Sequence, residues 1–90
     1  MNCYVYKGLQ KQDHYVFTGQ ELDNLEDPDL PAAIVKHLGG LSFVLEFELT
    51  PERSLQQADP VQVLKDIESQ GFYLQMPKED VAKIEQEYFS

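Results

Sequence analysis

Three side chains of this 90-residue chain have the chemistry of a nucleophile, a base or a metal ligand: Cys3, His14 and His37. A reactive thiolate needs a nearby cation or a helix start to lower its pKa. His14 would supply the base of a Cys-His hydrolase if a hairpin placed it opposite Cys3. The histidines show neither HxxxH spacing nor a CxxC partner motif, so zinc is not predicted. We expect Cys3 to be a small core residue, and the chain to be no enzyme and to hold no metal or cofactor.

A second group of side chains is acidic and lies in the segment 19–30. It has the composition of a cation-binding loop, but it lacks the glycine-centred ligand spacing of an EF-hand. We therefore expect a solvated acidic loop, formed by Glu21, Asp23, Glu26, Asp27 and Asp29.

Arg53 is the single arginine, and it stands in the stretch LTPERSL directly after an apolar run. Its planar guanidinium group is suited to grip a phosphate or a carboxylate. An ordinary surface ion pair with Glu52, Asp59 or another nearby acid is the alternative that we favour.

Aromatic side chains are the remaining candidates for binding. Tyrosine is enriched at interfaces because its ring is apolar and its tip is polar. Most of the aromatic residues should pack in the core, and an exposed subset should form a binding surface. The candidates are Tyr4, Tyr6, Tyr15, Phe72 and Tyr73.

The composition narrows the class of partner. Sixteen acidic against seven basic residues give a formal net charge of −9, and the basic residues form no run. This charge repels nucleic acid in bulk and favours a basic protein partner. One cysteine allows no internal disulfide, and no segment reaches the roughly 20 apolar residues of a membrane helix. We expect a cytoplasmic protein.

The elements that must position these side chains follow from local patterns. Runs of aromatic and β-branched residues predict strands, and the first two are close enough for an antiparallel hairpin. The run 41–49 alternates strictly, so that its five odd-numbered apolar residues should share one face. The strand after Gly71 is apolar on both faces, which favours a place inside the sheet. The expected strands are 2–7, 13–18, 41–49 and 72–76.

Helices are expected between these strands. Pro31 suits a first helical position and Gly39 a left-handed stop, and Asp59 with Pro60 opens a second helix that ends before Gly71. A third helix should follow Pro77, with Val81, Ile84 and Tyr88 on one side. The order ββαβαβα predicts one α/β domain over 1–90, with a small mixed four-stranded sheet and helices on both faces, an α/β/α sandwich.

Several of these motifs together resemble the YcgL domain family of bacteria. They are CYVY at 3–6, YVF at 15–17, LP at 30–31 with LG at 38–39, LTPER at 49–53, and above all QGFYLQMP at 70–77. The resemblance implies an α/β/α sandwich and small cytoplasmic proteins whose biochemical role is not established. It also implies a gene neighbourhood near RNase D or near the genes for division-site selection. The stretch KGLQKQ at 7–12 and the acidic loop are less basic than the corresponding segments of the family. Both differences weaken any phosphate-binding role that the resemblance would imply.

Three functional hypotheses follow. The first is a non-enzymatic domain that binds a protein partner through an exposed aromatic and acidic surface. The alternative is an RNA-metabolism factor or nuclease accessory that binds RNA or phosphate near Arg53. The third is a hydrolase that uses Cys3 and His14, and it requires the two side chains to meet at a pocket.

Overall fold

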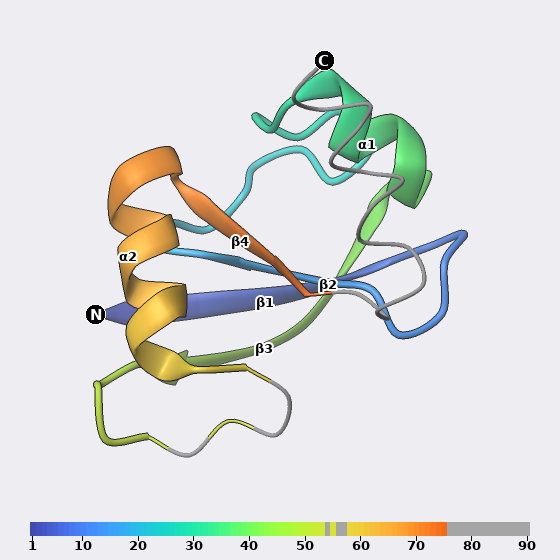
Figure 1. The fold of residues 1–90 in the computed structure, drawn as a ribbon. Coiled ribbons are helices and arrows are strands. Elements are labelled where there is room, and N and C mark those ends of the chain that lie inside the picture. Colours follow the sequence, from blue (N-terminus) through green and yellow to red (C-terminus); the bar gives the residue numbers. More distant parts are fainter. Residues whose placement is uncertain (54, 56–57, 76–90) are drawn as a thin grey trace.

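A computed structural model describes residues 1–53, 55 and 58–75, and it has the α/β fold that the sequence predicts. One four-stranded sheet, in the order β3-β1-β2-β4, is flanked by two helices (Figure 1). The strands are β1 (Asn2–Gly8), β2 (Tyr15–Thr18), β3 (Leu41–Glu48) and β4 (Phe72–Gln75), and the helices are α1 (Ala32–Leu38) and α2 (Pro60–Gln70). The helix predicted after Pro77 lies outside the described residues.

Every pairing in the sheet is antiparallel, so the prediction of a mixed sheet is wrong. The crossover that suggested parallel neighbours does exist. β2 and β3 both run antiparallel to β1, and therefore in the same direction as each other, and α1 connects them. β1 lies between them, however, so the two strands never pair.

β4 is an edge strand, which corrects its expected place inside the sheet. Among the described strands it pairs with β2 alone. Its apolar character has a different cause, because both of its faces are covered. Phe72 and Leu74 pack in one core cluster and Tyr73 packs against the other.

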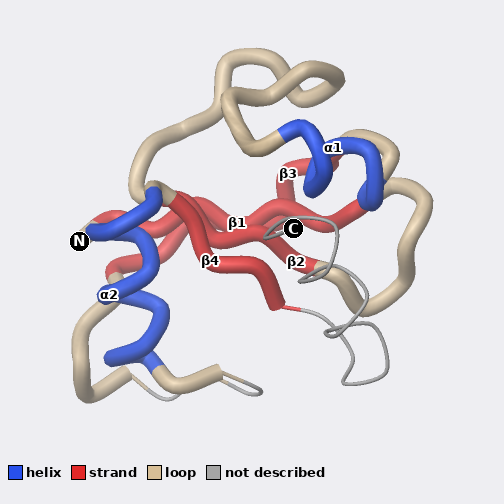
Figure 2. Tube along the Cα trace, turned by 45° about the horizontal axis from the view of Figure 1, so that its top comes forward, coloured by secondary structure: helices blue, strands red, loops and turns tan. Residues whose placement is uncertain are grey.

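Alternate residues of the central hairpin face two separate core clusters. The α2 face of the sheet is formed by Cys3, Val5 and Phe17, which pack with Val63 and Ile67 of α2. The α1 face is formed by Tyr6, Val16 and Phe72, which pack with Ile34 and Leu38 of α1. In Figure 2 the long β2–α1 connection and α1 lie on one side of the sheet. α2 lies at the end of the sheet that is far from α1. Leu22, Leu25 and Leu30 of that connection also pack on the α1 face.

The helix ends follow their sequence signals. Asp59 caps α2 by accepting a hydrogen bond from the Val61 amide at 3.0 Å, and Gly71 ends α2 at φ 91°. Gly39 ends α1 in the same left-handed conformation, at φ 69°. Within the described part of the chain, neither helix has the length and apolar character to cross a membrane.

A β-bulge divides β3 between the two faces, so the expected single apolar face of 41–49 is wrong. Val5 pairs with Leu45 but Tyr6 pairs with Phe43, which leaves Val44 as the extra residue. Leu41 therefore packs on the α1 face, whereas Phe47 and Leu49 pack on the α2 face. Alternation in the sequence could not reveal this change of face, because one inserted residue reverses every side chain beyond it.

Candidate functional site

The structure separates Cys3 from His14 and thereby removes the hydrolase hypothesis. Cys3 is fully buried on the α2 face. His14 precedes β2 opposite Gly8, whose amide donates to the His14 carbonyl. Gly8 lies five residues beyond Cys3 on β1, which is about 17 Å at about 3.4 Å per residue. His14 also contacts His37 of α1, on the other side of the sheet.

Burial keeps Cys3 in its thiol form. Loss of water around the side chain raises its pKa from 9.0 to about 11, against a smaller opposing effect of the N-terminal ammonium group. An unfolded chain therefore releases this proton at lower pH than the folded protein does. A thiol protonated at neutral pH is a poor nucleophile, which supports the expected structural role of Cys3.

This pKa predicts a loss of stability at alkaline pH. Between about pH 9 and about pH 11 the folded protein binds more protons at Cys3 than the unfolded chain, so the free energy of unfolding falls as the pH rises. The contribution lost should be roughly 2 to 3 kcal/mol. Urea unfolding of the wild type and of Cys3→Ala across this range measures it. The variant should lose less stability than the wild type, and equal losses in both proteins would contradict the prediction.

The two histidines, which lie far apart in the sequence, are neighbours in the fold. Their ring centroids are 5.1 Å apart, and His14 Nδ1 donates to the Gln12 carbonyl at 2.7 Å. No local pattern in the sequence indicates this contact, because it depends on how α1 packs against the hairpin. No group of three or more possible metal ligands occurs among the described residues.

Arg53 lies after β3, with its guanidinium carbon 4.4 Å from the centroid of the Phe47 ring. This is a cation–π contact. No carboxylate of the described residues lies within ion-pair distance of Arg53, which differs from the favoured prediction. Arg53 also lines neither of the two best-defined cavities of the described structure. The RNA alternative therefore stays a prediction with no supporting pocket.

The four tyrosines predicted for binding occupy different places. Tyr6 is 1% exposed, and its hydroxyl oxygen accepts a hydrogen bond from the Leu22 amide at 2.8 Å. Tyr15 and Tyr73 are half-buried against the α2-face core, where Tyr73 meets Phe17 edge-on. Tyr4 is half-buried on the α1 face beside the acidic loop. Tyr4 and Tyr6 therefore both lie next to the acidic loop, and Tyr6 is the buried one of the two.

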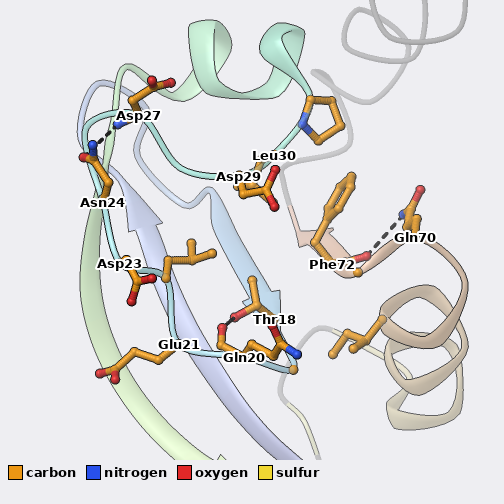
Figure 3. A pocket seen from close by; sticks show the side chains of 15 residues that line it. Thr18, Gln20, Glu21, Asp23, Asn24, Asp27, Asp29, Leu30, Gln70 and Phe72 are labelled. Carbon is orange, nitrogen blue, oxygen red and sulfur yellow. Dashed lines mark hydrogen bonds between the residues drawn. The ribbon is translucent and has the colours of Figure 1, made fainter.

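A hollow of about 920 Å³ lies between the loop 19–31 and the junction of α2 with β4. In Figure 3 the loop forms one wall, with Asp29 facing across toward Phe72, and the segment from Gln70 to Phe72 forms the other. Four of the predicted loop acids line this hollow: Glu21, Asp23, Asp27 and Asp29. Asn24 orders the loop between them, because its side-chain oxygen accepts from the amides of Glu26 and Asp27 at 3.0 and 3.1 Å.

Acids from the loop and from β3 converge on Tyr4. The carboxylate of Glu46 raises the Tyr4 pKa above 10.0 by its charge, and desolvation, a hydrogen bond to Glu46 and the charge of Glu21 raise it further. Glu46 is paired with Tyr4 across β1 and β3. In Figure 3 the side chain of Glu21, at the start of the loop, points toward β1 and β3. The loop and β3 thus form one acidic surface.

We call this region the acidic end of the sheet, defined by Glu21, Asp23, Asp29, Glu46 and Glu48. The carboxylate of Glu48 is ion-paired with the N-terminal ammonium group. β2 and β3 both end there. The lysines of the hairpin lie at the opposite end, where Lys7 pairs with Ser42 at the start of β3 and Lys11 lines a second hollow of about 580 Å³. Lys36 in the last turn of α1 lies at that end too. The loop acids and the hairpin lysines therefore lie at opposite ends of the sheet, so the described surface is asymmetric in charge.

β3 adds an exposed apolar edge to this surface. Phe43, Val44 and Leu45 are 48%, 42% and 45% exposed, although they stand in the middle of the strand. The alternation of 41–49 places Phe43 and Leu45 on one shared apolar face, so these exposed residues are not among the predicted binding candidates. A correct prediction of the strand order could have identified them, because an edge strand has a neighbouring strand on one side only and its side chains are therefore less covered.

Comparison with known proteins agrees with the resemblance seen in the sequence. The YcgL domain model matches residues 3–78. A YcgL domain-containing protein of Thioalkalivibrio sulfidiphilus is 44% identical over 80 residues, which cover 89% of this chain and 95% of the relative. Relatives of the same description in Xanthomonas euvesicatoria and Xanthomonas oryzae are 46% and 44% identical, over 87% and 98% of this chain and 87% and 99% of their own. The chain therefore belongs to the YcgL domain family.

Proposed function

We propose that this chain is a non-enzymatic protein-interaction domain that binds a basic partner at the acidic end of its sheet. The observation that carries the proposal is the convergence on Tyr4 of Glu46 from β3 and Glu21 from the loop. These residues lie on different elements, and the fold brings them to one aromatic side chain. An aromatic group next to two carboxylates is suited to lysine and arginine side chains.

Two further observations support a binding role over a catalytic one. The single thiol is buried and protonated, and it lies far from both histidines. The loop that carries the acids is held in place by the hydrogen bond from the Leu22 amide to Tyr6. An ordered acidic loop loses less conformational entropy on binding than a flexible one does. The proposal places the domain in the bacterial cytoplasm, where a lone cysteine stays reduced.

The proposal is tested by removing charge from the loop without changing its shape. A variant with Glu21→Gln, Asp23→Asn and Asp29→Asn is immobilised beside the wild type and exposed to a native bacterial lysate. The wild type should retain one or more basic proteins at about 50 mM salt and release them at about 0.5 M salt, because screening shortens the range of attraction. The loop variant should retain much less of the same proteins.

A control variant carries the same net charge at other exposed positions: Asp13→Asn, Glu52→Gln and Glu68→Gln. It should behave like the wild type. Retention of nothing by the wild type at low salt would contradict the proposal, and so would retention of the same set by all three proteins.

A further inference from the structure

The outer edge of β3 offers unpaired backbone groups next to exposed apolar side chains. Among the described strands, β3 pairs with β1 alone. Phe43, Val44 and Leu45 lie at the centre of this edge, each more than two-fifths exposed. An exposed edge strand accepts further strands readily, and natural proteins therefore commonly keep their edge strands short, charged or covered. β3 has acids only in its last three residues.

The bulge determines what kind of segment can cover the edge. Phe43 lies on the α1 face, where its ring meets Tyr6 edge-on, and Leu45 lies opposite Val5 on the α2 face. A helix that lay on one face would cover only one of these side chains. A strand added along the edge covers both of them and pairs the free backbone groups.

A second copy of this chain fits the edge poorly. An antiparallel β3–β3 pairing that keeps the faces continuous sets Phe43 beside Glu46 of the second copy and Leu41 beside its Glu48. By symmetry each unfavourable contact occurs twice. Carboxylates placed against apolar side chains lose water without gaining a partner. A different chain, with basic residues opposite the acids, avoids this conflict.

We infer that the β3 edge binds an extended segment of a basic protein by antiparallel strand addition. The C-terminal half of the segment carries apolar residues and lies along Phe43, Val44 and Leu45. Its N-terminal half carries lysine or arginine and lies along Glu46. The carboxylate of Glu48 is already paired with the N-terminal ammonium group. The inference rests on the proposed function and adds the mode and direction of binding. The antiparallel direction follows the pairing of all the strands in the sheet.

Two synthetic peptides of about ten residues, the usual upper length of a strand, test the direction. In the first, lysine alternates with threonine in the N-terminal half, and valine and isoleucine fill the C-terminal half. The second has the same two halves in reversed order. Calorimetry with the full chain should show binding of the first peptide at least about tenfold tighter than the second, because only the first matches charge and apolar contacts together. Equal affinity would indicate attraction of charge alone and would overturn the inference.

Two lysine substitutions test the place of binding. Val44→Lys puts a charge on the edge, and Val61→Lys puts one on an equally exposed apolar position of α2. Val44→Lys should weaken the first peptide at least about tenfold and Val61→Lys should leave it unchanged, since a lysine on an edge opposes strand pairing. Equal binding to both variants overturns the inference, as does no binding to the wild type at millimolar peptide.

The same variants show whether a second copy of the chain, or another part of the same chain, covers the β3 edge instead. If the wild type dimerises in sedimentation and Val44→Lys abolishes the dimer, a second copy occupies the edge and the inference is overturned. If Val44→Lys lowers the melting temperature without peptide far more than Val61→Lys does, the chain covers its own edge, which overturns it too. Should the peptides fail while the loop variant still loses its lysate partners, the proposed function stands and docking lies elsewhere on the acidic end.

Discussion

Replacing Leu38 by alanine should lower the free energy of unfolding by roughly 3 to 5 kcal/mol, because the side chain is fully buried and its removal leaves a cavity. Leu38 is the last residue of α1 and packs on the α1 face. It lies tightly against the sheet, since a Cβ built at Gly8 would come within 2.9 Å of its Cδ2 atom. A glycine at this place in β1 therefore allows the close contact of helix and strand.

Urea unfolding at neutral pH measures this loss. Leu9→Ala is the matched control, because the same truncation is made at a side chain that is 58% exposed, and it should change stability by less than about 0.5 kcal/mol. Similar effects of the two substitutions would mean that α1 does not form a packed layer on this face.

Replacing Tyr6 should affect both the core and the acidic loop. Tyr6→Ala should lower the free energy of unfolding by roughly 3 to 5 kcal/mol, because a buried ring and its edge-on contact with Phe43 are lost. Tyr6→Phe should lower it by about 1 to 3 kcal/mol, because the partly buried Leu22 amide then loses its acceptor.

Amide hydrogen exchange separates the two effects. In Tyr6→Phe the Leu22 amide should exchange faster while the amides of α2 keep their rates, since the loop opens locally. Tyr15→Phe is the control, because the Tyr15 hydroxyl makes no hydrogen bond to the described residues, and it should leave Leu22 unchanged. An unchanged Leu22 rate in Tyr6→Phe would show that the hydroxyl does not hold the loop.

Local signals in the sequence predicted the elements well, because each depends on neighbouring residues. Asp59 with Pro60 and Gly71 define the two ends of α2, and Gly39 ends α1. The hairpin of β1 with β2 follows from two short aromatic runs separated by a polar turn. These features need no knowledge of distant parts of the chain.

The pairing of distant elements was not predictable in the same way. An apolar strand covered by helices on both faces looks the same in sequence whether it lies at the edge or inside the sheet, as β4 shows. The bulge at Val44 becomes visible only in the register of β3 against β1. The acidic loop was predictable, because its composition is a local property of the sequence. The neighbourhood of Glu46 and Tyr4 and the exposed apolar edge were not predictable, because both depend on how the strands pair.

We propose that the partner of this YcgL domain binds where the loop acids meet β3. Amide hydrogen exchange of the wild-type chain, alone and with the basic protein that it retains at low salt, tests this placement. Exchange should slow in residues 19–31 and 43–48, and it should stay unchanged in residues 7–13 at the lysine end of the sheet. Slower exchange confined to residues 7–13 or to α2 would contradict the claim.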